Sequence, residues 1–380
     1  MHQKKMMSKK PATNDQTQLT DNGSQEGLSQ MAAPNKQIPV QAQAARSVVT
    51  VIVPVYNDTD NLKLCLSALA ESTYDRFDVL VVDDGSTEAI KPLVERFSYR
   101  YLRIDGPGGP ARARNRGVEQ VETEYVIFID ADVCVHPDTI ERFMHKFAGE
   151  PDLAAVIGSY DDAPAEPGFL SQYRNMFHHY THCQSAGQVM TFWSGCGAMR
   201  RDVFLRHGGF DEQRYRYPAI EDIELGTWVS AGGGRILLDP TIQCKHLKHW
   251  TFSNMVKTDV CQRGIPWIDL MLRSGKAVKT LNVTWLQRLS VGLVFTACAF
   301  VVLAVWWPSA LIGAAVAAIA VTLVNIKLYR FFVSRRGLWF AAKSLLFHWL
   351  YFGCCGVSFI AGTVRFYASG LRTSGRHRDG

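Results

Sequence analysis

Asp130 and Asp132 directly follow the apolar run 125–129, within the segment EYVIFIDADVCVHPD. Side chains at positions i and i+2 of an extended chain point to the same side, so the two carboxylates would repel each other. Each would raise the pKa of the other unless a positive group lies between them. The pair therefore indicates either a site for a positive group or a solvated strand end that leads into a turn.

The segment around the aspartates predicts how they are positioned. From residue 47 to about residue 160, short apolar runs alternate with segments in which apolar residues recur at helical spacing. The runs that predict strands cover residues 48–56, 77–86, 101–105, 124–132 and 153–160. Strands that alternate with helices across short loops predict right-handed crossovers, and therefore an α/β fold with a mostly parallel sheet.

A second acidic pair, Asp83 and Asp84, ends another of these runs in FDVLVVDDGS. Ligands of open α/β sheets bind in the crevice outside the carboxyl ends of the strands. Asp83, Asp84, Asp130 and Asp132 are all expected at that edge. Two acidic pairs at one edge favour a binding site over a chance strand end.

Composition narrows the protein class. The nine scattered cysteines of the 380 residues show neither metal-ligand spacing nor a disulfide framework, which favours a reducing cytoplasm. Residues 1–46 are polar and lack the apolar core of a signal peptide, so they predict a disordered tail. The net charge of +6 has its excess in the tails and beside the C-terminal apolar segments. This distribution suits an anionic membrane surface and argues against nucleic acid as a partner.

The C-terminal part predicts a membrane region over residues 289–364. No charged residue occurs between 289 and 326, and WWPS lies at the middle of this stretch. We expect two spanning helices, 289–307 and 308–326, rather than a buried hairpin of a soluble protein. The basic residues that follow mark the cytoplasmic side, which places both hairpin ends and the α/β domain there, at the inner membrane.

The sequence allows more than one interpretation of the segments that flank the hairpin. A third apolar segment, 344–364, could span the membrane, re-enter it or lie at its interface. Residues 256–288 predict an amphipathic interfacial linker, and residues 365–380 a basic tail.

Six motifs, taken together, resemble a known family. VVTVIVPVYN, LVVDDGSTE, ARARNRG, FIDADV, GCGAMRRDVFLRHGGFDE and EDIELG occur in the order and rough spacing of the inverting family-2 glycosyltransferases, which have the GT-A fold. The resemblance covers about residues 48–250 and implies a catalytic domain over 47–255. It also implies a nucleotide-diphosphate sugar as donor and Mg²⁺ or Mn²⁺ as cofactor.

The resemblance assigns roles to the acidic motifs. Asp132 matches the direct metal ligand, and Asp130 matches a position near the ribose and the water molecules of the metal. Asp222 matches the base that takes the proton of the acceptor, with Glu221 as the alternative base or an acceptor-positioning group. Asp83 or Asp84 would contact the nucleobase, which favours UDP and leaves GDP and dTDP open.

Further positions match the rest of the family's site. The nucleotide-sugar-binding group comprises Pro54, Tyr56, Asn57, Arg114, Asn115, His246 and Arg263. The segment that borders the sugar and the acceptor comprises Gly195, Cys196 and Gly197.

These observations predict a membrane-attached inverting glycosyltransferase. Its acceptor would be a hydroxyl or phosphate of a lipid-linked molecule or cell-envelope glycan, because tethering raises the effective concentration of such acceptors. A polysaccharide-synthase-like polymerising transferase is one alternative, although QRGIPW departs from the Gln-x-x-Arg-Trp spacing of those enzymes. A catalytically inactive membrane scaffold is the alternative from another class. The oligomeric state stays open.

Overall fold

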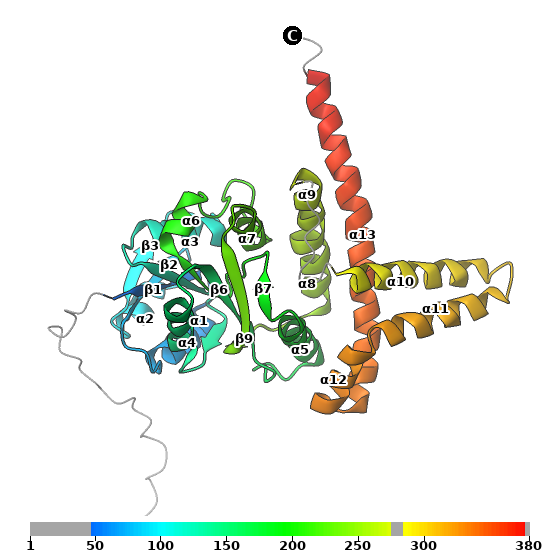
Figure 1. The fold of residues 1–380 in the computed structure, drawn as a ribbon, viewed down its shortest axis with the longest axis horizontal. Coiled ribbons are helices and arrows are strands. Elements are labelled where there is room, and N and C mark those ends of the chain that lie inside the picture. The colour runs from blue at the N-terminus through cyan, green and yellow to red at the C-terminus, as the bar shows by residue number, and fades with distance from the viewer. Residues whose placement is uncertain (1–46, 275–283, 377–380) are drawn as a thin grey trace, which may run out of the picture. The chain divides into compact units, whose positions relative to one another are not determined.

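The computed structural model describes residues 47–274 and 284–376, without the side chains of 369–376 (Figure 1). The predicted tail 1–46 lies outside the described residues, as do 275–283 and 377–380.

One mixed sheet forms the centre of the predicted catalytic domain. Its strands run in the order β3-β2-β1-β4-β8-β6-β9-β5, and β7 pairs with β9. The strands are β1 (Val49–Val55), β2 (Phe77–Asp83), β3 (Arg100–Arg103), β4 (Tyr125–Ile129), β5 (Val133–Val135), β6 (Leu153–Tyr160), β7 (Gly187–Val189), β8 (Cys196–Arg200) and β9 (Arg235–His246). The strands β1 to β4 pair in parallel, whereas β8 is antiparallel to β4 and β6. The predicted α/β fold with a mostly parallel sheet is confirmed.

Helices cover both faces of this sheet (Figure 1). They are α1 (Thr59–Ala70), α2 (Ile90–Glu95), α3 (Pro110–Glu119), α4 (Thr139–Gly149), α5 (Phe169–Gln184), α6 (Arg201–Arg206) and α7 (Glu221–Ala231). Because side chains alternate along a strand, Val51 and Val53 of β1 pack against α1, while Ile52 faces α3. Burial on both faces explains the continuous apolar runs in the sequence.

A helical region follows the sheet. It comprises α8 (Phe252–Lys257), the π-helical segment η2 (Thr258–Gly264), α9 (Ile265–Ser274), α10 (Trp285–Leu303), α11 (Ala310–Val324), α12 (Ile326–Arg336) and α13 (Leu338–Arg376). Phe332 of α12 packs with Tyr173 and Phe177 of α5 in one apolar cluster. The ion pair of Arg335 with Asp162, 3.2 Å long, adds a polar contact. The helical region is therefore docked onto the catalytic domain.

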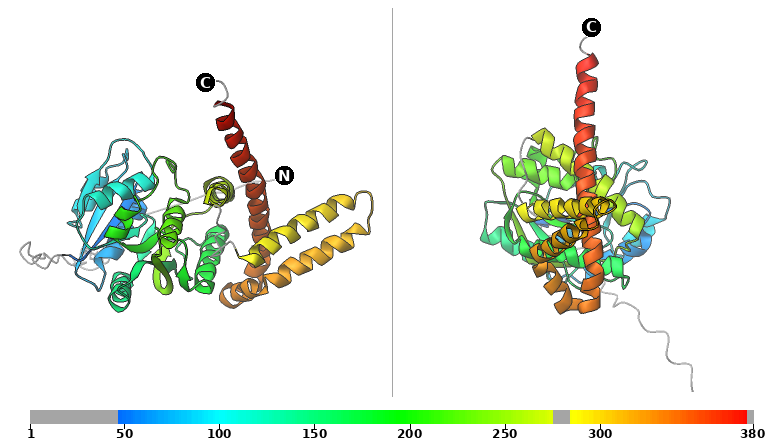
Figure 2. Two further views of the ribbon diagram at one scale, coloured as in Figure 1. Left: turned by 45° about the horizontal axis from the view of Figure 1, so that its top comes forward. Right: turned by 90° about the vertical axis from the view of Figure 1, so that its right-hand side faces the viewer.

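Within the described residues, α10 and α13 are long and apolar enough to cross a membrane. The pair α11 and α12 also qualifies if it is counted as one span, although it bends by 66° at a break. Figure 2 shows α10 and α11 side by side, as expected for the hairpin over 289–326. The third apolar segment belongs to α13, which continues into the predicted basic tail as far as Arg376.

Candidate active site

A cavity of about 1140 Å³ lies at the carboxyl edge of the parallel strands. Its walls come from the catalytic domain and also from η2, α9, α10 and α13. The predicted site residues that line it are Pro54, Tyr56, Asp84, Arg114, Asp130, Asp132, Gly195, Glu221, Asp222, His246 and Arg263. The predicted residues outside its lining are Asn57, Asp83, Asn115, Cys196 and Gly197. The structure thus brings most of the motifs together although they are up to 209 positions apart in the chain.

The aspartates that follow β4 each have a cationic or basic neighbour. Arg114 Nη2 donates to Asp130 Oδ1 at 2.6 Å, and His246 Nε2 lies 3.7 Å from Asp132 Oδ2. Burial raises the pKa of Asp130 even though Arg114 opposes it, and the charge of Asp132 adds to the rise. Burial also acts to raise the pKa of Asp132, but His246 and Lys248 together bring it below its usual value. Arg114 and His246 thus compensate the repulsion between the two carboxylates that the sequence predicts.

The ligand atoms around Asp130 and Asp132 decide which kind of metal site the pair could form. Among the described residues, no group of three or more His, Cys, Asp and Glu side chains is placed to hold a metal ion. Asp132 and His246 offer at most two protein ligands. Mg²⁺ in phosphate-transfer sites is held by one or two carboxylates, with phosphate and water oxygens completing the shell. The residues fit an ion that binds together with the diphosphate, and they do not form a cage for an ion by itself.

Arg114 joins three elements in the cavity wall. This buried guanidinium, on α3, donates to Asp130 beyond β4 and to Glu221 Oε1 on α7 at 2.9 Å. Burial raises the pKa of Glu221, and neighbouring Asp222 raises it further, while Arg114 opposes the rise. Glu221 is therefore buried and paired with Arg114, whereas neighbouring Asp222 is more exposed.

Asp222 lies at the first turn of α7 and is held in one orientation. Ser194 donates to Asp222 Oδ2 from its backbone nitrogen at 2.9 Å and from its hydroxyl at 3.0 Å. The backbone nitrogen of Ile223 donates to Oδ1 at 2.8 Å. A carboxylate fixed in this way beside Gly195 is suited to accept a proton from a bound hydroxyl. Ser194 was missed by sequence reasoning, although it directly precedes the small residues of SGCG.

Glu224, one turn along α7, has structural partners. Its Oε2 accepts from the hydroxyl of Tyr215 at 2.5 Å, and its Oε1 accepts from Arg273 Nη1 at 3.2 Å. Since Arg273 lies on α9, this contact connects α7 with the helical region that follows the sheet.

The two aspartates at the end of β2 differ. Asp83 is fully buried and accepts from Tyr101 at 2.6 Å, Arg103 at 2.7 Å and the nitrogen of Ser86 at 2.8 Å. Burial acts to raise the pKa of Asp83, but these hydrogen bonds, with Tyr101 foremost, lower it below its usual value. Asp83 thus anchors the strand end, and only Asp84 reaches the cavity.

Asp84 holds the glycine-rich loop GPGGP in place. The backbone nitrogens of Gly108 and Gly109 donate to its carboxylate at 3.0 and 2.7 Å. Burial raises the pKa of Asp84, although both loop nitrogens oppose the rise. Gly109 has a φ of +89°, and a Cβ there would lie 2.4 Å from the carbonyl oxygen of Arg216. Position 109 therefore requires glycine, because a larger residue would keep the loop from approaching the carboxylate of Asp84.

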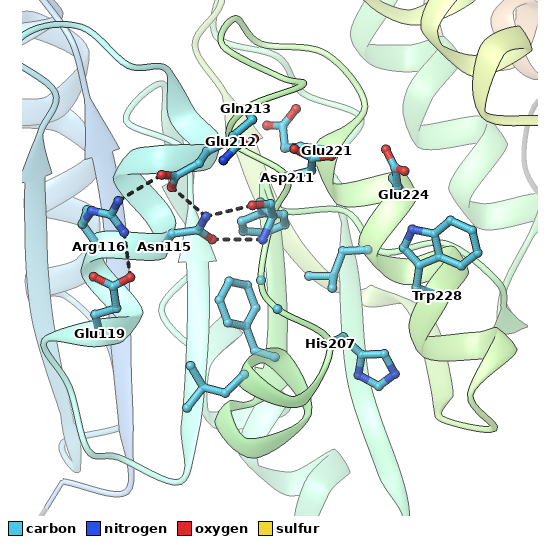
Figure 3. A pocket seen from close by; sticks show the side chains of 16 residues that line it. Asn115, Arg116, Glu119, His207, Asp211, Glu212, Gln213, Glu221, Glu224 and Trp228 are labelled. Carbon is cyan, nitrogen blue, oxygen red and sulfur yellow. Dashed lines mark hydrogen bonds and ion pairs between the residues drawn. The ribbon is translucent and has the colours of Figure 1, made fainter. Parts of the chain in front are cut away.

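The two predicted asparagines connect loops. Asn57 Oδ1 accepts from the nitrogen of Thr87 at 2.7 Å, next to the cavity but not in its lining. Asn115 lies in a second hollow of about 590 Å³, where its side chain exchanges two hydrogen bonds with the backbone of Phe210 (Figure 3). Arg116 beside it pairs with Glu119 and Glu212 (Figure 3). Neither asparagine is placed against the main cavity.

An aromatic wall was missed by sequence reasoning. Tyr160 stacks on His246 with ring centroids 4.2 Å apart, and His178, His182 and Trp193 continue the wall. Burial lowers the pKa of His182 to about 4 and that of His178 well below its usual value, so both are neutral near pH 7. The signal was available in the sequence, because two histidines four positions apart share one face of a helix.

Six lysine and arginine side chains line the main cavity, and they form two groups. Arg114 and Arg174 are buried and bound to carboxylates, Arg174 to Asp259 through two hydrogen bonds of 2.7 and 3.0 Å. The others have no ion-pair partner within the described part of the chain, and they are Arg216, Lys248, Arg263 and Arg288. Unpaired cations that surround a cavity favour a ligand with several negative charges.

Comparison with known proteins agrees with this geometry. The family model described as glycosyl transferase family 2 matches residues 50–208. Glycosyltransferase AglE of Haloferax volcanii is 36% identical over 108 residues, which are 27% of this chain and 36% of that protein. Poly-beta-1,6-N-acetyl-D-glucosamine synthase of Staphylococcus aureus is 28% identical over 221 residues, or 56% of this chain and 53% of the synthase. The matched segments thus span about half of these relatives or less.

The fold has a solved counterpart. Mannosyltransferase PcManGT of Pyrobaculum calidifontis, solved with GDP-Man and Mn²⁺, superposes with a TM-score of 0.51. The alignment covers 83% of this chain and 88% of that one at 20% identity, and it supports the shared fold. The motifs, the matched family model and the GT-A architecture agree, and residues 50–208 of this chain are similar to glycosyl transferase family 2.

Proposed function

We propose that this protein is an inverting glycosyltransferase that moves a sugar from a nucleotide-diphosphate sugar to an acceptor held at the membrane. The proposal is carried by one cavity that contains the fixed carboxylate of Asp222, the Asp132–His246 pair and four cations without an ion-pair partner among the described residues.

The donor would lie against the catalytic domain. Asp84, Pro54 and Tyr56 would surround the nucleoside, and Asp130, which lines the same cavity, would contact the ribose. Asp132 and His246 would hold Mg²⁺ or Mn²⁺, which neutralises charge on the leaving diphosphate when bound. Lys248, in the loop after β9, and Arg263 of η2 also line the cavity and would face the same charge.

Asp222 supplies the base. It takes the proton of the acceptor hydroxyl while the hydroxyl oxygen forms a bond to the anomeric carbon. The bond from that carbon to the diphosphate breaks, and the electron pair leaves with the nucleoside diphosphate. Attack from the side opposite the leaving group inverts the anomeric configuration. Ser194 keeps the carboxylate aimed at the acceptor, and an acceptor phosphate would attack already ionised.

The membrane attachment supports an acceptor at the lipid surface. α12 carries Lys327, Arg330, Arg335 and Arg336 and packs directly on the catalytic domain. Basic residues that flank spanning helices favour the cytoplasmic side, so we place the catalytic domain at the cytoplasmic face of the inner membrane.

A polymerising transferase is the second candidate. One of the matched relatives is named poly-beta-1,6-N-acetyl-D-glucosamine synthase, and this similarity favours the second candidate. The two candidates differ in product length, because a polymerising enzyme extends one acceptor repeatedly.

The test is a donor screen on the purified full-length protein in lipid nanodiscs. UDP-, GDP- and dTDP-sugars are added with Mn²⁺, and thermal stabilisation and release of the nucleoside diphosphate are measured. We expect one nucleotide class to raise the melting temperature and to be turned over when a membrane lipid extract is added. An inactive scaffold would show neither stabilisation nor turnover with any donor. Mass spectrometry of the products separates single transfer from polymerisation.

A further inference from the structure

Tyr160 is the last residue of β6, and its ring contacts two different parts of the candidate site. The ring stacks on His246, with centroids 4.2 Å apart and planes 12° apart. It meets Trp193 edge to face, with centroids 4.8 Å apart and planes at 85°. Aromatic pairs at such separations stabilise each other beyond the area that they bury. One side chain therefore supports two neighbours in the cavity wall.

The first neighbour, His246, depends on this stack for its orientation. Its Nε2 lies 3.7 Å from Asp132 Oδ2, which is too long for a hydrogen bond that would fix the plane of the ring. The backbone of His246 is held by pairing with Val133 of β5. Since this pairing does not set the side-chain torsions, the parallel ring of Tyr160 is the contact that orients the imidazole toward Asp132.

The second neighbour, Trp193, connects the same ring with the proposed base. A Cβ added to Gly195 would lie 2.7 Å from the indole of Trp193, so the indole packs directly on this glycine. The carbonyl oxygen of Gly195 accepts from the nitrogen of Asp130 at 3.3 Å. Ser194, between them, donates two hydrogen bonds to Asp222. A shift of the indole would therefore move the groups that hold the base.

Tyr160 itself is anchored through its backbone. His179 Nδ1 donates to the carbonyl oxygen of Tyr160 at 2.6 Å, and Asn175 Nδ2 donates to the carbonyl oxygen of Asp161 at 2.7 Å. Both donors lie on α5. The side chain of Tyr160 contacts its neighbours through the ring, which also packs on His178 with centroids 4.5 Å apart. A fixed backbone and a buried ring suit a supporting role.

We propose that Tyr160 is a positioning residue that orients His246 toward Asp132 and holds Trp193 beside the base. This inference rests on the proposed function and deepens it. Metal binding and proton transfer then depend on one ring, although their own residues follow different strands. Tyr160 exchanges no proton and acts only through its two neighbours.

Substitutions of Tyr160 separate the ring from the hydroxyl. Tyr160→Phe keeps the ring, whereas Tyr160→Leu removes it and keeps apolar volume. Tyr160→Met also lacks a ring and is used if the leucine variant does not fold. Tyr125→Leu is the matched control. Tyr125 is 9% exposed, against 8% for Tyr160, and packs on Phe147 with centroids 4.4 Å apart, but it begins β4 and lies outside the cavity lining.

The first measurement concerns the metal and needs no turnover. The full-length protein in nanodiscs is titrated with UDP, GDP and dTDP by calorimetry, once with Mn²⁺ and once with EDTA. The ratio of the two Kd values gives the contribution of the metal within each variant. We expect Tyr160→Leu and Tyr160→Met to lower this ratio about two- to tenfold, the range of one aromatic pair. Tyr160→Phe and Tyr125→Leu should keep the parent ratio.

Double variants test whether Tyr160 acts through its neighbours. In a His246→Ala background, Tyr160→Leu should lower the manganese ratio no further, because the contact is already absent. The second measurement is the single-turnover rate with saturating donor and Mn²⁺ and the membrane lipid extract. Tyr160→Leu should lower this rate, and Trp193→Leu should lower it while keeping the manganese ratio. In a Ser194→Ala background the effect of Tyr160→Leu on the rate should be smaller.

The outcomes distinguish the inference from the function on which it rests. If the parent binds none of the nucleotides, or binds them equally with Mn²⁺ and with EDTA, the proposed function fails and the inference with it. If the parent shows the manganese effect and Tyr160→Leu shows the same effect, the inference alone is wrong. Equal losses in Tyr160→Phe would assign the role to the hydroxyl. Equal losses in Tyr125→Leu would show a general loss of stability, and either result overturns the positioning role.

Discussion

The two halves of the main cavity differ in how their charges are compensated. Beside the sheet, Arg114 is bound to Asp130 and Glu221, and Asp222 accepts three hydrogen bonds. Toward the helical region, Lys248, Arg263 and Arg288 have no carboxylate partners among the described residues. Paired charges hold the carboxylates beside the sheet in position, whereas the unpaired cations can each accept a negatively charged ligand group. Substitutions beside the sheet should therefore lower stability, whereas substitutions toward the helical region should weaken ligand binding.

The largest effect on stability is expected for Arg114→Ala. The change leaves Asp130 and Glu221 buried without a counter-charge, and breaking a buried pair typically costs about 3–5 kcal/mol. Chemical denaturation of the parent and the variant measures this loss. Arg116→Ala is the neighbouring control, because its ion pairs are partly exposed and are expected to contribute at most about 1 kcal/mol. Similar losses in the two variants would show that Arg114 is not the centre of the network.

An intermediate effect is expected for Ser194→Ala, which removes one of the two hydrogen bonds to Asp222 Oδ2 and keeps the backbone one. A hydrogen bond to a charged group contributes about 1.5–3 kcal/mol, which corresponds to roughly a 10- to 100-fold lower kcat. Because Ser194 positions the base, the KM for the donor should stay near the parent value. Ser194→Thr keeps a hydroxyl and should recover part of the rate. An unchanged kcat in the alanine variant would contradict this role.

Lys248→Gln tests the part of the cavity whose cations have no carboxylate partners among the described residues. Loss of a cation that faces the diphosphate should weaken donor binding roughly tenfold, an effect of about 1.4 kcal/mol, and more so at low salt. The free energy of unfolding without donor should change by less than about 0.5 kcal/mol, as for other surface positions. Titration calorimetry and denaturation separate the two quantities. A large loss of stability with intact binding would reverse the distinction between the halves.

A smaller, pH-dependent effect is expected at Asp83. Its folded-state pKa lies below the unfolded value, so its contribution to stability is present above about pH 4 and is lost as the pH falls through the folded-state pKa. Tyr101→Phe removes one of the hydrogen bonds that lower this pKa. The stability difference between the parent and this variant should therefore shrink as the pH falls below about 4. A difference that is constant from pH 6 to pH 3 would show that Asp83 does not titrate as described.

The sequence predicted the sheet and most of the cavity, because strand patterns and short motifs are local signals. Local signals could not predict which residue of a motif lines the cavity and which one only supports the fold. Asp83 and Asp84 are adjacent, yet only the positions of Tyr101 and Arg103 make the first of them structural. Asn115 likewise depends on the backbone of Phe210, 95 positions away. Nothing local to α10 reveals that Arg288 lines the same cavity as Asp222, because that depends on how the helical region packs on the sheet.

The central claim is that Asp222 is the base of a sugar transfer. It is tested most directly by single-turnover kinetics of Asp222→Asn with the donor found in the screen. The amide cannot accept the proton yet has a similar shape, so we expect a rate loss of about 10²- to 10⁴-fold with a donor Kd within a few-fold of the parent. Glu221→Gln, measured alongside, should impair folding or acceptor binding more than chemistry. Turnover of Asp222→Asn within a few-fold of the parent would contradict the account.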